Sequence, residues 1–232
     1  MKKFLIGLFL LPSFVFAQDC GNYFYLTNNG QVQMKVYDKK GKESGTQTWK
    51  ITDVKKDGKA VVSTVNASFT DEKGKELTKS SGSYRCENGM LKADVRMSMP
   101  QEQMQAYKDA EGQVETVYLE YPAKLTTGQS LNDADFTMNL QMKNGVGTTK
   151  VSFKEVNRKV GNKESITTPA GTWEAYIITY DATFRTEIGG IGIPFQLSGK
   201  EWFVPQLGIV KTETYNKNGK LIGSSVLSSI TK

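Results

Sequence analysis

The sequence predicts an all-β protein, in which an antiparallel meander forms a strongly curved sheet or a partly open β-barrel. Two observations support this fold class. Turn signals with glycine and asparagine, which supply the positive φ of tight hairpins, recur along the chain. Between the turns, apolar and polar residues alternate with a period of two, as half-buried strands require. The turn signals are Asn28-Asn29-Gly30, Lys40-Gly41, Asp57-Gly58, Lys73-Gly74, Asn88-Gly89, Glu111-Gly112, Asn144-Gly145 and Asn218-Gly219.

Residues 1–17 have the pattern of a secretory signal peptide that is cleaved after Ala17. Two lysines precede an apolar run, and a small residue stands before the polar Gln18. A membrane anchor fits less well, because Pro12 interrupts the run and the run is shorter than the roughly 20 residues that span a bilayer. We therefore expect one β-rich domain over residues 18–232, with no transmembrane segment after removal of the signal.

The two cysteines of the chain, Cys20 and Cys86, both follow the predicted cleavage site. In an oxidising compartment we predict that they form a disulfide, and the alternative is two free thiols. Asp19 stands directly before Cys20, where a lipid-modified cysteine would need a small residue. We expect a periplasmic or extracellular protein that is soluble rather than lipid-anchored.

The formal net charge of +6 includes the two lysines of the predicted signal peptide. Most of the other lysines lie in polar turns, such as residues 38–43 and 216–220. Such positions favour solvated loop tips over a nucleic-acid surface, so we expect no nucleic-acid partner.

Between the turns, several short runs alternate in the way that half-buried strands do. In the longest run, residues 173–186, Tyr176, Tyr180 and Phe184 share one face, and Asp181 and Arg185 share the other. A strand of this length usually bends around a barrel. The shorter runs are residues 61–69, 91–97, 136–142 and 222–230.

One segment breaks the β pattern and predicts a short helix near residues 99–110. Ser98 and Gln101 form a capping box, Pro100 suits the first turn, and Gly112 offers a stop. We expect this helix to cover one side of the sheet.

Residues 199–227 predict a strand, a turn, a second strand, a hairpin and a third strand. Pro205 ends the ladder of the first strand. We expect Trp202 to face the interior beside Tyr176 and Tyr180, mainly as packing.

The chain contains no histidine, which removes the usual general base and the commonest zinc ligand. Carboxylates remain, and a pair about 5 to 9 Å apart could hydrolyse a glycoside. Nothing in their spacing pairs them, so we expect no enzyme, no catalytic residue and no cofactor. The carboxylates that lie near the aromatic C-terminal half are Glu174, Asp181, Glu187 and Glu201.

Three methionines, Met97, Met99 and Met104, lie within eight positions. Thioethers bind Cu(I), so the cluster offers a weak copper site. Methionine also fills irregular gaps where elements pack, and no histidine is present to complete the site. We expect no metal.

Five blocks of the sequence are similar to the TapB-like group of exported bacterial proteins, which is part of a wider domain family of unknown function. The resemblance spans nearly all of the expected mature chain. It implies a curved antiparallel sheet or partly closed barrel in an envelope or secreted protein, and it implies no established activity. The blocks are CGNYFYLTNNGQ, VYDKKGKESGT, LEYPAKLTTGQSLND, ITTPAGTWEAYIITYD and WFVPQLGIVKTETYNKNGKLIGSSVL.

Two functions of an exported non-enzymatic protein remain open. The curved sheet could bind a lipid or another small apolar or amphipathic ligand, unless its aromatic residues only fill the barrel. Alternatively, the protein is a structural or assembly component of the cell envelope or export machinery, and contacts a partner through a sheet edge or the hairpin at residues 189–195. An enclosed apolar cavity lined by these aromatic residues favours the first function, and a filled barrel with an exposed apolar hairpin favours the second. The candidate ligand contacts are Trp173, Tyr176, Tyr180, Phe184 and Trp202.

Overall fold

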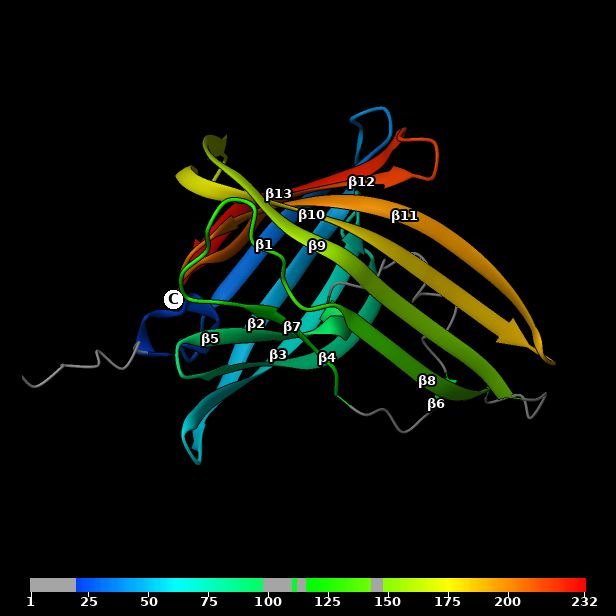
Figure 1. The fold of residues 1–232 in the computed structure, drawn as a ribbon, viewed down its shortest axis with the longest axis horizontal. Coiled ribbons are helices and arrows are strands. Elements are labelled where there is room, and N and C mark those ends of the chain that lie inside the picture. The colour runs from blue at the N-terminus through cyan, green and yellow to red at the C-terminus, as the bar shows by residue number, and fades with distance from the viewer. Residues whose placement is uncertain (1–19, 98–109, 112–115, 143–147) are drawn as a thin grey trace, which may run out of the picture.

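The structure, a computed structural model, describes residues 20–97, 110–111, 116–142 and 148–232. It confirms the predicted fold class, because its strands form one 13-stranded antiparallel sheet that curls into a barrel (Figure 1). The order along the sheet is β6-β8-β9-β10-β11-β12-β13-β1-β2-β3-β4-β5-β7. The strands are β1 (Gln31–Asp38), β2 (Glu43–Asp57), β3 (Ala60–Asp71), β4 (Glu76–Glu87), β5 (Met90–Asp94), β6 (Ala110–Glu111), β7 (Tyr118–Tyr121), β8 (Ala134–Met142), β9 (Thr148–Thr168), β10 (Gly171–Ile188), β11 (Ile191–Val204), β12 (Gly208–Asn216) and β13 (Leu221–Thr231). Three 3₁₀ turns accompany them: η1 (Cys20–Asn22), η2 (Phe24–Leu26) and η3 (Val95–Met97).

Glycine turns connect most neighbouring strands, as the sequence predicts. Gly41, Gly58, Gly74 and Gly89 have positive φ at the four successive hairpins from β1 to β5, and Gly219 does so between β12 and β13. The first and last strands, β1 and β13, also pair with each other, so the two halves of the meander form one continuous wall.

The sheet nearly closes into a barrel, and one arginine bridges the remaining seam between the edge strand β7 and β9. Arg158 of β9 donates from Nη1 to the backbone oxygens of Glu120 (3.2 Å) and Asn132 (3.1 Å). In the same region the Leu131 amide donates to the Arg158 carbonyl (2.9 Å). A side chain therefore replaces part of the strand pairing that would complete the barrel.

The two longest strands, β9 and β10, bend around this barrel. Their pairing shifts register between Tyr176 and Ile178 and again between Thr179 and Asp181, and Asn157 has a φ of 57° at the irregularity. Such bulges increase local twist and allow a long strand to curve. The expected strand at 173–186 is confirmed within β10, but β9, with 21 residues, is longer.

The predicted strand at 91–97 ends early, at Asp94, and η3 follows it. The fully buried Asp94 carboxylate accepts a hydrogen bond from the Arg96 amide (3.0 Å) and pairs with the Arg96 guanidinium, which draws the chain into a turn. Most of the predicted helix near 99–110 lies outside the described residues, as does the predicted signal peptide. Ala110, the last residue of that prediction, belongs instead to β6.

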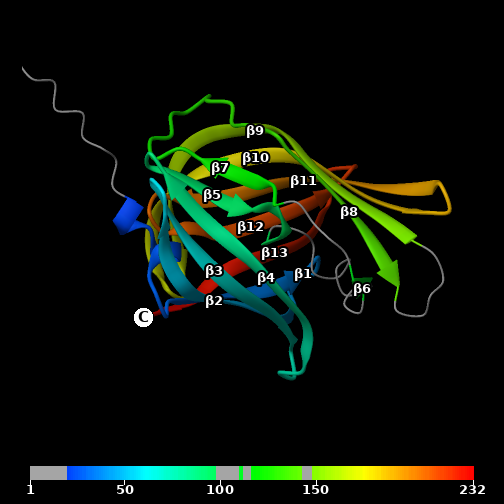
Figure 2. The same ribbon diagram turned by 90° about the horizontal axis from the view of Figure 1, so that it is seen from below.

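The N-terminal residues 20–30, here called the plug, close one end of the barrel (Figure 2). The disulfide between Cys20 and Cys86 forms as predicted and ties the plug to β4. The Tyr23 hydroxyl donates to the Gly89 carbonyl (2.8 Å), and Ser63 Oγ donates to the Tyr25 carbonyl (2.6 Å).

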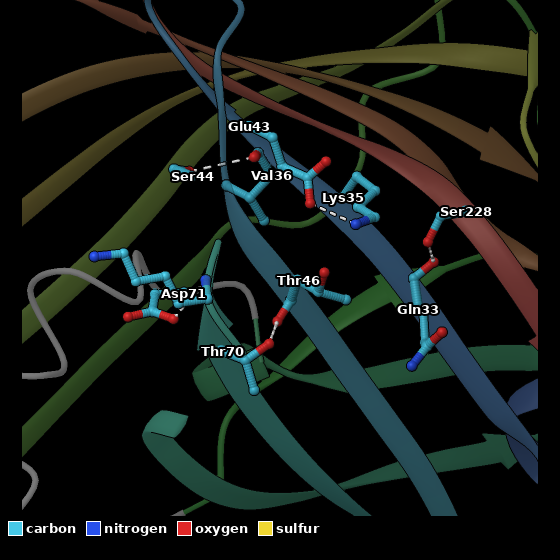
Figure 3. A network of polar contacts seen from close by, with 10 residues as sticks. Gln33, Lys35, Val36, Glu43, Ser44, Thr46, Thr70, Asp71 and Ser228 are labelled. Carbon is cyan, nitrogen blue, oxygen red and sulfur yellow. Dashed lines mark hydrogen bonds and ion pairs between the residues drawn. The ribbon is translucent and has the colours of Figure 1, made fainter. Parts of the chain in front are cut away.

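The opposite end, here called the mouth, carries the hairpin turns at residues 39–42, 72–75, 189–190 and 217–220. Figure 3 shows polar contacts between the strands that lead to it. Ser44 Oγ donates to the Val36 carbonyl (3.2 Å), and Lys35 forms an ion pair with Glu43. Among the described residues, none of the helical segments has the length and hydrophobicity of a bilayer crossing.

Candidate functional site

A cavity of about 300 Å³ lies inside the barrel, between the plug and the mouth. Residues from nearly every part of the wall line it, and its mouth side includes Asp38, Thr214 and Gly223. Most of the lining is apolar or aromatic. The large aromatic side chains of the wall include Trp49, Phe69, Tyr84, Tyr121, Tyr180 and Phe203.

Two aromatic stacks build the deep part of this cavity. The Tyr25 ring, from the plug, stacks on Tyr84 of β4 with centroids 4.2 Å apart. Tyr121 of β7 stacks on Phe203 of β11 with centroids 4.6 Å apart and planes within 5°. The stacks fix these rings in place, so the cavity has a rigid aromatic floor.

Glu201 places a buried carboxyl on this floor. It lines the cavity and is 2% exposed, because alternation along β11 turns Glu201 and Phe203 to the same inner face. Its Oε2 accepts a hydrogen bond from the Tyr121 hydroxyl (3.1 Å). Burial raises the Glu201 pKa, and the Arg158 charge and the Tyr121 hydrogen bond partly oppose that rise.

Glu155 and Arg158 of β9 complete a buried polar cluster with Glu201. Arg158 Nε lies 2.9 Å from Glu155 Oε1, and the guanidinium sits 4.9 Å from the centroid of the Tyr121 ring. Burial, followed by the charge of Glu201, raises the Glu155 pKa to about 8. Within the described part of the chain, four buried atoms of this cluster have no well-aligned hydrogen-bond partner: both carboxylate oxygens of Glu155, and Nε and Nη2 of Arg158.

Tyrosine hydroxyls around the cluster stay neutral over the ordinary pH range. Burial raises the pKa of Tyr84, Tyr121 and Tyr180, and negative carboxylates nearby raise it further. These side chains can therefore donate hydrogen bonds, but they cannot serve as bases near neutral pH.

Of the predicted ligand contacts, Tyr180 lines the cavity. Its ring lies across Gly199, where a Cβ would stand 2.2 Å from the ring. Phe184 is buried without reaching the cavity wall. The assignment of Tyr180 as a ligand contact stays a prediction.

The other two aromatic candidates of β10 also lie off the cavity wall. Trp173 is partly exposed, and its Nε1 donates to Thr168 Oγ1 (3.1 Å) beside the β9–β10 turn. Tyr176 is partly exposed as well, with the Lys163 ammonium 5.4 Å from its ring centroid. Their partners are protein groups of the β9–β10 hairpin.

The expectation that Trp202 faces the interior is wrong. Because Glu201 and Phe203 line the cavity, the alternation of β11 turns Trp202 to the outer face. The indole is nevertheless only 6% exposed and belongs to the apolar core, so the expected packing role is confirmed. Its Nε1 donates to Glu164, and the Lys211 ammonium lies 4.2 Å from its ring centroid.

The predicted carboxylates do not converge with Glu201. Glu174 is exposed, Asp181 accepts a hydrogen bond from Asn157 Nδ2 (2.9 Å), and Glu187 lies 3.5 Å from Arg185. The partner of Glu201 is Glu155, which sequence reasoning missed. A signal was present: Val151, Phe153 and Glu155 alternate along one face, so the carboxyl occupies an apolar position of a strand.

Met97, from the predicted methionine cluster, lines the cavity and packs its Sδ against Gly82, where a Cβ would lie 2.6 Å away. Met99 and Met104 lie outside the described residues. The weak copper site is therefore untested.

An exposed apolar hairpin projects from the mouth. Ile188, Ile191 and Ile193 are 64%, 77% and 76% exposed around the Gly189-Gly190 turn. Their register places them on the same face as Phe195, which is partly exposed and also lines the cavity. The apolar inner surface of the barrel therefore continues into solvent along one hairpin. The structure shows a cavity, which Tyr180 alone among the five aromatic candidates lines, together with an exposed apolar hairpin, so it matches neither expected combination in full.

Comparisons with known proteins agree with this fold. The sequence model of the DUF3108-like family matches residues 28–227. One similar crystal structure is of a protein from Bacteroides fragilis described as exported, with a YmcC-like fold: the identity is 20%, the match covers 89% of this chain and 97% of that chain, and the TM-score is 0.72. Another, from Parabacteroides distasonis and described as a lipoprotein, is 22% identical over 92% of this chain and 100% of that chain, with a TM-score of 0.74. The curated proteins include no significant match.

Proposed function

The chain belongs to the DUF3108-like family, and we propose that this member is an exported, non-enzymatic protein that holds a small apolar or amphipathic ligand inside its barrel. The narrower resemblance to the TapB-like group stays a prediction. A lipid fragment or another molecule with an apolar body and a small polar head fits the proposal.

The cavity is the observation that carries this proposal. Its volume of about 300 Å³ lies at the lower end of the range of small-molecule sites. Its walls are mainly apolar and aromatic, and polar side chains such as Glu201, Thr212 and Ser225 interrupt them. A mainly apolar wall with a limited set of polar groups is typical of sites that bury most of a ligand and orient it by one end. A barrel filled only for packing would leave no such space.

Binding fits the geometry better than catalysis does. A carboxylate-based hydrolase needs two carboxyls that flank the bond to be broken. Of Glu155 and Glu201, only Glu201 lines the cavity. A ligand can therefore contact one carboxyl of the pair, and we propose no reaction.

Native mass spectrometry of the protein purified from its own envelope tests the proposal. We expect a mass increase from a co-purified small molecule that is lost on denaturation. Ala182→Phe, at a position that lines the cavity, should abolish the increase by filling the space. Thr183→Phe places the same ring on the neighbouring position, which faces the outside, and should leave the increase intact. A clean apo mass for the native protein, together with no binding of added amphiphiles, would refute the proposal.

Export rests on the predicted signal peptide and gains support from the disulfide between Cys20 and Cys86, since such bonds persist in oxidising compartments. Fractionation of cells that express the full chain should recover the oxidised protein outside the cytoplasm. A cytoplasmic protein with two reduced thiols would overturn this part of the proposal.

The exposed hairpin favours a second candidate function, contact with another envelope component. Among the described strands, β11 extends six residues beyond its first pair with β12, Leu197 with Asn216, so the hairpin tip projects roughly 20 Å. Pro194 removes one amide from this free edge, which disfavours addition of a further strand. A photo-crosslinking residue at Ile193 should form adducts in whole cells, and the same residue at Thr172, exposed near the opposite end, should not.

A further inference from the structure

We propose that the cavity selects a ligand with a cationic head, an organic ammonium group, which binds against Glu201 on the aromatic floor. This inference rests on the proposed function, because it names the class of ligand that the same cavity takes.

The charges of the buried cluster do not balance without such a cation. Two carboxyls, those of Glu155 and Glu201, face one guanidinium, that of Arg158. When all three groups are ionised, one negative charge remains uncompensated in a site that is almost fully buried. Burying an unpaired charge is costly, so the site gains from a cation or holds a proton in its place.

Arg158 is not positioned to receive an anionic head. Its Nη1 is engaged by the Glu120 and Asn132 carbonyls and its Nε lies beside Glu155. Its Nη2 has no hydrogen-bond partner among the described residues, but Arg158 is not part of the cavity wall. A carboxylate or phosphate that entered the cavity would meet Glu201 instead. The wall therefore disfavours fatty acids and other anionic amphiphiles.

The rings of the floor add a second attraction for a cation. Tyr84 and Phe203, which each use one ring face in a stack, line the cavity together with Glu201, whereas Tyr121 already packs between Phe203 and the Arg158 guanidinium. Faces of aromatic rings attract ammonium groups, and combined aromatic and carboxylate walls recur in sites for organic cations. Aromatic rings also accept the apolar body of the ligand, so one surface serves both parts of an amphiphile.

A proton occupies the site when no cation is bound. Burial and the charge of Glu201 raise the Glu155 pKa to about 8, so the cluster holds an extra proton at neutral pH. The ionisable groups that face Glu201 and Glu155 are Arg158 on β9, Tyr121 on β7, Tyr84 on β4, Tyr180 on β10, and Asp133 before β8. Entry of a cation favours release of the proton, and the affinity for a cation should therefore rise with pH up to about 8.

The structural role of Arg158 does not account for both carboxyls. Arg158 bridges the seam of the barrel, and one buried carboxylate would neutralise it. Glu155, at 2.9 Å, is sufficient for that purpose. Glu201 lies on the cavity wall and accepts its hydrogen bond from a neutral tyrosine, so seam closure leaves Glu201 unexplained.

Three eight-carbon probes of equal length test the inference by isothermal titration: octylamine, octanol and octanoate. Near pH 8 we expect octylamine to bind at least about tenfold more tightly than octanol, and octanoate to bind most weakly. From pH 6.5 to pH 8.5, where an alkylamine stays protonated, the octylamine affinity should rise about tenfold or more, and the octanol affinity should stay flat.

Variants and outcomes separate this inference from the function on which it rests. Glu201→Gln should remove the preference for octylamine and its pH dependence while octanol still binds, and Glu174→Gln, at an exposed site, should behave as the parent. If octanol or octanoate binds as tightly as octylamine, the inferred preference for a cationic head is refuted, whereas the proposed binding of amphiphiles in the cavity stands. If none of the three binds, the proposed function fails with it. Should Glu201→Gln not fold, the pH profiles of the parent protein with octylamine and octanol decide the question alone.

Discussion

The two ends of the barrel differ in their residues and in the contacts that hold them. At the plug, buried aromatic rings, backbone hydrogen bonds and a disulfide join residues 20–30 to β3, β4 and the β11–β12 turn. At the mouth, hairpins end in glycine turns, and one hairpin leaves Ile188, Ile191 and Ile193 in solvent. The plug has the composition of a protein core, and the projecting hairpin has that of a contact surface.

This difference suggests that the two ends of the barrel have different roles, one in stability and the other in contact with other molecules. We expect the long-range contacts at the plug to contribute most to the free energy of unfolding. We expect a ligand to enter the cavity at the mouth, where the inner face of the barrel meets solvent. The cavity lies between the two ends, with Tyr25 of the plug as part of its floor and residues next to the hairpin turns at its rim. Changes at the plug should therefore cost stability, whereas changes at the projecting hairpin should alter association with other molecules and leave stability nearly unchanged.

Removal of the disulfide should have the largest effect on the plug. Cys20 and Cys86 are 66 residues apart, and a loop of that length predicts a loss of about 4 kcal/mol in the free energy of unfolding. Urea denaturation of the variant with both cysteines changed to serine measures the loss. The parent protein under reducing conditions should match the variant. A loss below about 1 kcal/mol would show that the plug holds without its covalent link.

Tyr25→Ala should cost about 3 kcal/mol, because Tyr25 is 5% exposed, stacks on Tyr84 and packs against Gly208. Phe195→Ala, at the mouth, is the matched control. Phe195 is 42% exposed, so its loss should cost less than about 1 kcal/mol in the same urea titration. Equal losses at the two positions would contradict the division between plug and mouth.

Sequence alone predicts most of the wall of this barrel and little of its interior. Glycine turns such as Gly41 and Gly219, and the alternation in β8 and β10, follow from local rules that tertiary contacts do not override. The disulfide follows from compartment and count. The alternation of β9 marks Glu155 as inward-facing, but its approach to Glu201 and the contacts of Arg158 with Glu120 and Asn132 join segments distant in sequence, which only the closed register brings together.

Trp202 shows why the faces of an aromatic strand are hard to assign. Trp202, Phe203 and Val204 are three large residues in a row, so the alternation does not show which of them face the interior. A shift of one residue exchanges the two faces of the strand. Glu201 was the misleading residue, since a carboxyl on the inner face contradicts the ordinary pattern. Departures from that pattern are expected at functional sites, and here the departure marks the candidate site.

The buried cluster between plug and mouth should make stability depend on pH. Glu155 has an ordinary pKa of 4.5 and a folded-state pKa near 8, so the folded protein binds more protons than the unfolded chain between these values. Stability should therefore fall as pH rises, by about 2 kcal/mol between pH 6 and pH 8. Glu155→Gln should flatten this part of the profile, and the exposed Glu174→Gln should leave it unchanged. A fall of equal size in Glu155→Gln would mean that other groups cause it.

The smallest effect on stability is expected at the projecting hairpin, where the comparison with the plug is sharpest. Ile191 and Ile193 are more than three-quarters exposed, so the change of both to serine removes little buried surface and should alter the free energy of unfolding by less than about 0.5 kcal/mol. If the hairpin binds another envelope component, the same variant should no longer associate with it in cell fractionation and in crosslinking. Thr172→Ser and Thr179→Ser, at exposed positions of β10, are the matched controls.

A large loss of stability in the isoleucine variant would mean that Ile191 and Ile193 belong to the core, and an unchanged distribution in the cell fractions would remove the proposed association. We expect instead that the variant keeps its stability and no longer binds the envelope component. This combination is the reverse of that expected at the plug, because an apolar side chain that stays in water contributes to folding only in proportion to the surface it buries.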